Sequence, residues 1–144
     1  MEAHFLNILS AEDDLDDQYF IEKAVEASGI EASVKFVSDG KSLLEKLAEL
    51  FGDALPDILL LDLNMPVMDG LAVLKVLRER EDIYDLPIII LTTSSDRRHI
   101  DQCYSLGADF FFTKPDSFTE PVKIFKSLPD LKNKYYFREF SSSE

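Results

Sequence analysis

The chain has 144 residues, with 15 Lys and Arg against 28 Asp and Glu, and a formal net charge of -13. This length accommodates one domain of ordinary size with its own core. The acidic balance argues against nucleic acid and against anionic membrane surfaces, because both are bound through clustered Lys and Arg. A protein partner or a cation is the expected ligand class.

Cysteine content and hydropathy restrict the cellular location. Cys103 is the only cysteine, so the chain cannot form an intramolecular disulfide. The sequence shows neither a signal peptide nor an apolar stretch long enough to span a bilayer. We therefore expect a cytoplasmic protein that does not engage a membrane.

Strands and helices are predicted to alternate along the chain. A short apolar strand at residues 5–10 precedes an amphipathic helix at 14–28. The residues expected to face inward from this helix are Leu15, Phe20, Ile21, Ala24 and Val25. The pattern then repeats, with strands near 34–37, 58–61, 88–91 and 110–112, and helices near 41–51, 70–80, 96–105 and 119–128.

Five strands alternating with five helices predict a doubly wound α/β fold. We expect a parallel five-stranded sheet with helices on both faces, in the common strand order 2-1-3-4-5. Residues 1–128 would form this domain. Residues 129–144 would form a C-terminal extension, aromatic and basic at first, with an end that is expected to be disordered.

Polar side chains follow several of the predicted strands. Asp62 ends the apolar run Ile58–Leu61, and Glu12 and Asp13 follow the first strand. In the order 2-1-3-4-5, strands one and three are neighbours, so these three carboxylates should lie side by side. Their mutual repulsion favours a bound cation, and oxygen-only ligands select Mg²⁺ first and Mn²⁺ second.

Beside a metal ion, Asp62 has the character of a nucleophile that accepts a phosphoryl group. Phosphoryl transfer mainly requires positive charge on the equatorial oxygens. Lys114, after the fifth strand, can supply that charge together with the metal, while Thr92, after the fourth strand, can donate a hydroxyl hydrogen bond.

These separated motifs closely resemble the receiver domains of two-component response regulators, which have the flavodoxin-like fold of chemotaxis receivers. The resemblance covers roughly residues 5–128. The residues that carry it are Glu12-Asp13, Asp62, Asn64-Met65-Pro66, Asp69-Gly70, Thr92 and Lys114-Pro115. It implies a stand-alone response regulator of a phosphorelay, phosphorylated at Asp62 by a sensor histidine kinase or phosphotransfer protein.

The resemblance also implies roles for individual residues. Mg²⁺ would be bound by Asp13, Asp62 and the backbone carbonyl of Asn64, and by Glu12 through water. Lys114 would contact the phosphoryl group, and its bond to Pro115 would be cis.

A second set of implied roles concerns the switch. Thr92 would move toward the phosphate, and Phe111, in place of the more usual tyrosine, would rotate inward. Asn64 and Ser94 would flank the path of the hydrolytic water. Output would pass to a protein target, with homodimerisation through the face formed by helix four, strand five and helix five as a further expectation.

Two other functions compete with this one. A haloacid-dehalogenase-type phosphohydrolase also uses a strand-end aspartate with Mg²⁺, but it carries a second acid two residues later, where this chain has Asn64. A phosphorylation-independent adaptor would keep the fold and lose the chemistry, which the intact set of Asp13, Asp62, Thr92 and Lys114 disfavours. We therefore expect no turnover of a metabolite.

The acids after the first strand also have a structural interpretation. Asp14, Asp16 and Asp17 are interpreted as a helix cap and first-turn acids, because carboxylates are common there. For Glu12 and Asp13 the metal-binding interpretation is preferred, because Asp62 and Lys114 occur where a metal site needs them.

Overall fold

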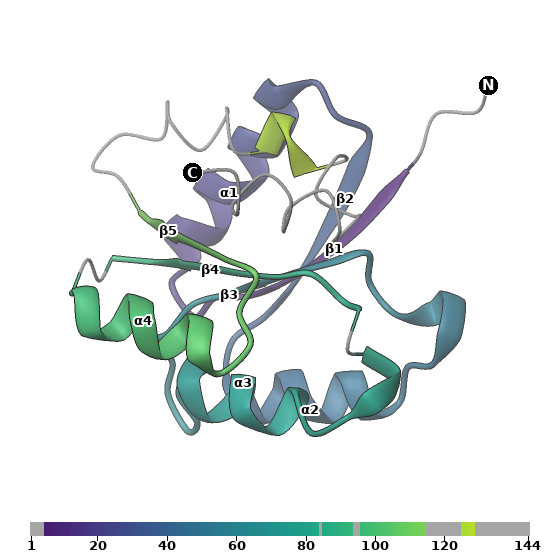
Figure 1. Ribbon diagram of the computed structural model, residues 1–144. Helices are drawn as coiled ribbons and strands as arrows, with labels where there is room; N and C mark the ends of the chain where they lie inside the picture. The colour runs from purple at the N-terminus through teal and green to yellow at the C-terminus, as the bar shows by residue number, and fades with distance from the viewer. Residues whose placement is uncertain (1–4, 84, 94–95, 115–124, 129–144) are drawn as a thin grey trace, which may run out of the picture.

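The computed structural model describes residues 5–83, 85–93, 96–114 and 125–128. Within them, strands and helices alternate as the sequence predicts (Figure 1). The strands are β1 (Leu6–Ala11), β2 (Ala32–Val37), β3 (Ile58–Leu61), β4 (Ile88–Thr92) and β5 (Phe110–Thr113). The helices are α1 (Leu15–Ser28), α2 (Gly40–Ala48), α3 (Gly70–Leu77) and α4 (Arg97–Ser105), with short 3-10 turns at Gly52–Ala54 and Glu81–Ile83.

The strands form one parallel sheet in the order β2-β1-β3-β4-β5, which confirms the predicted doubly wound fold. Every residue of β3 and β4 is buried. Strands covered on both faces read as continuous apolar runs, which is why these two were recognisable. They lie at the centre of the sheet, with β1 beside β3.

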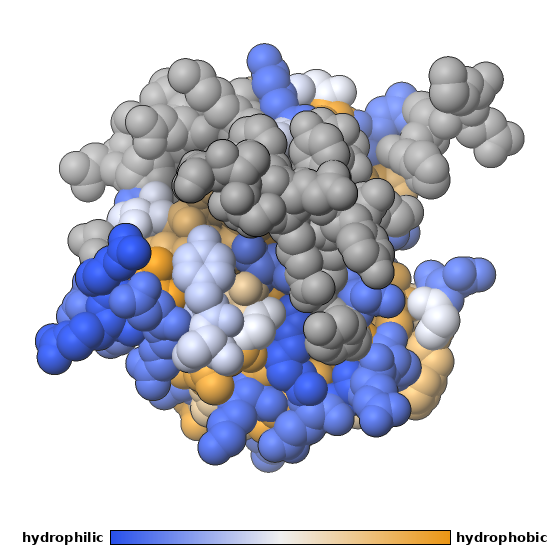
Figure 2. All heavy atoms as spheres, viewed as in Figure 1, coloured by the Kyte–Doolittle hydropathy of each residue, from blue (hydrophilic) through white to orange (hydrophobic). Residues whose placement is uncertain are grey.

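Helices cover both faces of the sheet (Figure 1). Alternate strand residues enter opposite cores: Ile58 and Leu60 pack toward α1, whereas Leu59 and Leu61 pack toward the side of α2, α3 and α4. Figure 2 shows mainly hydrophilic residues over the outer sides of the lower helices, with smaller hydrophobic patches between them. These helices are therefore amphipathic in the usual sense.

An aspartate caps the start of each of the described helices α1 to α4. The side chains of Asp14, Asp39, Asp69 and Asp96 each accept a hydrogen bond from a backbone N–H in the first turn of the following helix. The predictions that Asp14 caps a helix and that Asp69-Gly70 is a turn and helix start are confirmed.

Two inward residues predicted for α1 are wrong. Leu15 is 76% exposed and Phe20 is 42% exposed. The buried stripe consists of Ile21, Ala24, Val25 and Ser28. At 3.6 residues per turn, Leu15 lies two and a half turns before Ala24, on the opposite side of the helix, and Phe20 is rotated about 100° from Ile21.

The last predicted helix is described only over residues 125–128. Phe125 and Leu128 are buried in the core beneath α1. The rest of that helix and the C-terminal extension at 129–144 lie outside the described residues. Among the helices that the structure describes, none is long and apolar enough to cross a membrane.

Candidate functional site

The site forms where β1 and β3 end beside each other. Ala11 and Leu61 are register partners at the ends of these strands, and the Asp62 N–H donates to the carbonyl of Ala11 over 3.1 Å. Parallel pairing therefore brings the residues that follow each strand to the same edge. One carboxylate oxygen from each of Glu12, Asp13 and Asp62 lies within 4.8 Å of the others.

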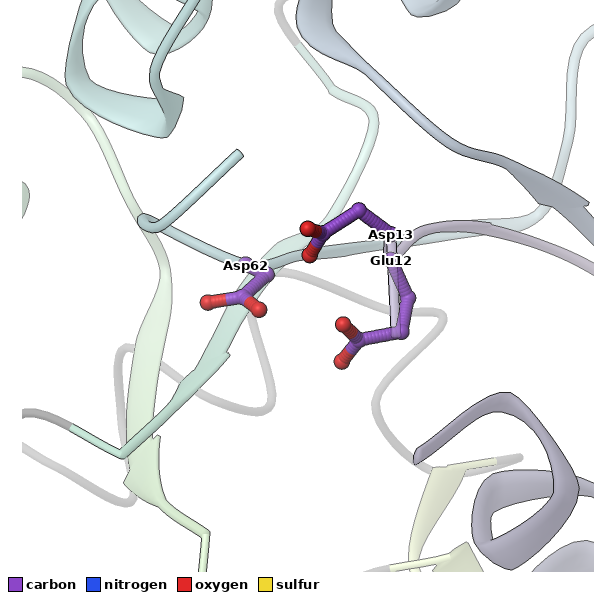
Figure 3. A group of neighbouring side chains, drawn as sticks. All are labelled: Glu12, Asp13 and Asp62. Carbon is purple, nitrogen blue, oxygen red and sulfur yellow. The ribbon is translucent and has the colours of Figure 1, made fainter. Parts of the chain in front are cut away.

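Figure 3 shows the three carboxylates directed toward a common space between the two strand ends. Their burial differs: Glu12 is 1% exposed, Asp62 is 6% exposed, and Asp13 is exposed. Burial raises the pKa of the Glu12 carboxyl to about 7, despite the lowering effect of its hydrogen bond to Lys114. A cation in this space would relieve both the repulsion and the cost of burying the charges.

Lys114 approaches the same space from the end of β5. Its backbone N–H donates to the carbonyl of Thr92 over 2.6 Å, which fixes the residue beside the end of β4. Its Nζ donates to Asp62 Oδ2 over 3.0 Å and to Glu12 Oε1. The structure thus brings together Asp62, the other two metal-ligand candidates and the lysine, as the sequence predicts.

A third carboxylate contacts the lysine. Asp17 Oδ2, on the first turn of α1, accepts from Lys114 Nζ over 2.8 Å. Burial alone lowers the pKa of the Lys114 ammonium, but the hydrogen bonds to Asp17 and Glu12 outweigh it and raise that pKa above its ordinary value.

The sequence interpretation of Asp17 was incomplete. Asp17 does lie in the acidic first turn of α1, and its N–H donates to the capping side chain of Asp14 over 3.1 Å. Its side chain, however, contacts the site. The one sequence feature that could have indicated this contact is the position of Asp17 four residues after Asp13, about one helical turn away. An acid that only stabilises the start of the helix would occupy the same position.

The loop after β3 holds the Asp62 carboxylate and connects it to Thr92. The Asn64 N–H donates to Asp62 Oδ1 over 3.1 Å, and Asn64 Nδ2 lies 3.5 Å from Thr92 Oγ1. Thr92 is fully buried. A Cβ added to Gly70 would lie 2.5 Å from the Asp62 carbonyl oxygen, so the start of α3 packs directly on the backbone of the site.

The predicted switch aromatic lies on the edge strand. Phe111 pairs in register with Ile90, and its side chain is half-buried against the core under α4. Its N–H donates to the Tyr104 hydroxyl on α4 over 3.1 Å. Ser94 and the Lys114–Pro115 bond, for which the sequence predicted a water-flanking role and a cis geometry, involve residues outside the described ones.

The donor set suits a hard divalent cation. It consists of carboxylate oxygens, with no histidine or thiol among them, and Asp13 is open to solvent. Both Glu12 oxygens already have partners, Lys114 for Oε1 and the Asp14 N–H for Oε2. Both Asp62 oxygens also accept hydrogen bonds, from the Asn64 N–H at Oδ1 and from Lys114 Nζ at Oδ2. Asp13, which is open to solvent, is therefore the side chain best placed to contact an ion directly.

Comparison with known proteins agrees with this geometry. A family profile described as "Response regulator receiver domain" matches residues 8–126. The chain is 33% identical over 125 residues to the probable methanogenesis regulatory protein FilR2 of Methanothrix harundinacea, covering 85% of this chain and 81% of that protein.

Two solved structures are similar over most of their length. A response regulator in red light signaling of R. palustris matches with a TM-score of 0.77 and 36% identity, covering 85% of this chain and 90% of that one. The Mn²⁺-bound form of response regulator Rcp1 matches with a TM-score of 0.75 and 26% identity, covering 87% and 92%. This chain belongs to the response regulator receiver domain family.

Proposed function

We propose that this chain is a phosphorylation switch of a two-component relay, in which Asp62 accepts a phosphoryl group in the presence of Mg²⁺. The observation that carries the proposal is the contact of Asp62 Oδ2 with Lys114 Nζ at 3.0 Å, within a group of carboxylates that suits a divalent ion. Receiver domains interact with histidine kinases or phosphotransfer proteins, and we assign such a protein as the phosphoryl donor.

The chemistry is a transfer between two nucleophiles. A carboxylate oxygen of Asp62 attacks the phosphorus of a phosphohistidine, the phosphorus–nitrogen bond breaks, and the imidazole leaves with the pair of electrons. When bound, Mg²⁺ supplies positive charge to the phosphoryl oxygens. Lys114 Nζ supplies further positive charge from the side of β5.

The ion would be held by Asp13, Asp62 and the backbone carbonyl of Asn64, with Glu12 acting through water. Asp13, exposed beside the two buried carboxylates, supports this assignment because it gives an ion access from solvent. Mn²⁺ is a second candidate ion, and the Mn²⁺-bound Rcp1 structure is consistent with it.

The switch would operate through Thr92 and Phe111. We propose that the Thr92 hydroxyl leaves its neighbour Asn64 and donates to a phosphoryl oxygen, and that Phe111 then rotates inward. Because Phe111 lies beside α4 on the edge strand, its movement would change the face formed by α4 and β5. That face is the proposed contact surface for a protein target or a second copy of the chain.

We assign no metabolic activity to the chain, because turnover would be limited to its own phosphorylation and dephosphorylation. A cytoplasmic location fits the proposed donor. A haloacid-dehalogenase-type phosphohydrolase needs a second acid two residues after the nucleophile. This chain has Asn64 there, which disfavours that function.

The test is incubation of the full chain with Mg²⁺ and acetyl phosphate, followed by intact mass measurement. We expect a mass gain of one phosphoryl group, lost in Asp62→Asn and retained in Asp53→Asn, an exposed aspartate on another surface. No mass gain and no Mg²⁺-dependent change would favour the adaptor, whereas steady phosphate release from small esters would favour the phosphohydrolase.

A further inference from the structure

The ammonium of Lys114 is shared among three carboxylates. Its Nζ contacts Glu12, Asp17 and Asp62, and its side chain is 5% exposed. An ammonium has three N–H donors, so these contacts use its entire donor capacity. A phosphoryl oxygen can bind Lys114 only if one of the present partners is released.

The three partners differ in how easily they can be released. The side chains of Glu12 and Asp62 are 2% and 7% exposed, whereas that of Asp17 is 25% exposed. A deeply buried carboxylate that loses its cation carries a large desolvation penalty. Asp17 lies on the surface of the first turn of α1, where water can replace the lysine.

Asp62 is itself the proposed phosphoacceptor, and Glu12 belongs to the proposed metal surroundings. Asp17 belongs to neither group. We propose that Asp17 is a positioning residue that holds the third donor of Lys114 in the resting state and competes with the phosphoryl group for it. The inference rests on the proposed function and deepens it, because it makes α1 a determinant of how strongly the site retains a phosphoryl group.

The competition has a signature that loss of structure does not reproduce. Asp17→Asn replaces a charge-assisted hydrogen bond by a weaker neutral one, so Lys114 releases this donor more easily and a phosphoryl analogue should bind more tightly. A variant that merely damages the site should bind more weakly. Asp16 provides a matched control, because it is an exposed acid in the same helical turn and no contact with Lys114 is found for it.

The experiment is a titration of the full chain with beryllofluoride at saturating Mg²⁺, which removes differences in metal affinity. Binding is followed through the backbone amide NMR signals of Asn64 and Thr92. We expect Asp17→Asn to bind about 1.4- to 5-fold more tightly than Asp16→Asn, the range that corresponds to the coupling energies of exposed ion pairs.

Equal affinities in the two variants, or weaker binding by Asp17→Asn, would overturn the inference while leaving the proposed function intact. No binding of beryllofluoride by the unmodified chain would overturn both. A second readout needs no phosphoryl analogue: the ¹⁵N signal of the Lys114 ammonium in the metal-free chain should shift in Asp17→Asn and stay in place in Asp16→Asn. An unchanged signal in Asp17→Asn also overturns the inference.

Discussion

Acids and bases are balanced at one end of the sheet and unbalanced at the other. At the amino ends of β4 and β5, Arg78 pairs with Asp109 over 3.1 Å, and both side chains are nearly buried. Arg78 also donates to backbone carbonyls of the adjoining loops, and Asp109 accepts from the Ile88 N–H. At the carboxyl ends, Glu12, Asp17 and Asp62 all contact one ammonium, that of Lys114, and Asp13 lies beside Glu12 and Asp62.

The difference separates structural charge from functional charge. At the amino end, one acid pairs with one base, and backbone groups make the remaining hydrogen bonds. We call this a closed arrangement, and it holds the adjoining loops together. An excess of acids is an open arrangement that favours an added cation. We therefore expect substitutions at the amino end to lower stability, and changes at the carboxyl end to alter responses to metal, pH and phosphoryl group.

The largest expected effect is the loss of the closed pair. Arg78→Met leaves the nearly buried Asp109 carboxylate without its cation, and the free energy of unfolding should fall by about 3–5 kcal/mol. The control is Arg97→Met, which breaks an exposed pair with Asp101 and should cost less than about 1 kcal/mol. Urea denaturation measures both. Similar losses in the two variants would contradict the contrast between closed and exposed pairs.

The second prediction concerns pH at the open end. Because the pKa of Glu12 is raised to about 7 from 4.5, the folded chain binds this proton more tightly than the unfolded chain does. The stabilisation is present below about pH 4.5 and is lost as the pH rises through 7. For this group alone, the loss in the metal-free chain is on the order of 3 kcal/mol.

Denaturation of the metal-free chain across this pH range measures the effect, with Glu12→Gln as the comparison. The difference in unfolding free energy between the two proteins should change with pH, and Mg²⁺ should stabilise the unmodified chain more at pH 8 than at pH 6. A constant difference would show that Glu12 ionises at an ordinary pKa.

Contacts that follow from the strand order could be predicted from the sequence, whereas contacts between single residues distant in sequence could not. Glu12, Asp13 and Asp62 were predicted to lie side by side, and they do, because the carboxyl ends of parallel strands meet at one edge of the sheet. The continuous apolar run of β3 also identified it as a buried strand. The pair of Arg78 and Asp109 joins residues far apart in sequence, and neither side chain carries a local signal of its partner.

Local signals also failed where two causes give the same pattern. Asp17 looks like a first-turn acid whether or not a lysine from β5 reaches it, so only the tertiary arrangement reveals the contact. Leu15 is apolar but lies on the exposed side of α1, which its spacing from the buried stripe indicates and its hydrophobicity does not.

The third prediction tests how tightly α3 packs on the site. Gly70→Ala places a Cβ 2.5 Å from the Asp62 carbonyl oxygen and 2.8 Å from Leu63 Cα, so the backbone must shift. We expect a loss of about 2 kcal/mol in unfolding free energy, together with weaker Mg²⁺ binding. Gly52→Ala has open space around the new Cβ and only a positive φ to overcome, which costs about 1 kcal/mol.

Mg²⁺ titration separates the two glycine variants. Gly52 precedes the start of β3, whereas Asp62 follows its end, so substitution of Gly52 should leave Mg²⁺ affinity at the unmodified value. Equal Mg²⁺ affinity in both variants would mean that the Asp62 backbone does not depend on the position of α3.

The smallest expected effect is at Val67, in the loop between Asp62 and α3. Val67 has φ of 70°, and the Met68 N–H donates to the Pro66 carbonyl over 2.7 Å, which together describe a γ-turn of the strained, positive-φ type. A β-branched side chain is disfavoured in this conformation. Val67→Gly should therefore raise the free energy of unfolding by up to about 1 kcal/mol, even though glycine loses more entropy on folding.

The same change at Val76, an exposed position within α3, should instead lower the unfolding free energy by about 0.5 kcal/mol, because glycine has a lower helix propensity than valine. Opposite signs for the two variants in urea denaturation would show that the open end of the sheet carries backbone strain as well as unbalanced charge. If Val67→Gly and Val76→Gly both lower the unfolding free energy, the positive φ of Val67 costs less than the entropy that glycine adds to the unfolded chain. The contrast between the two ends would then rest on charge and not on backbone strain.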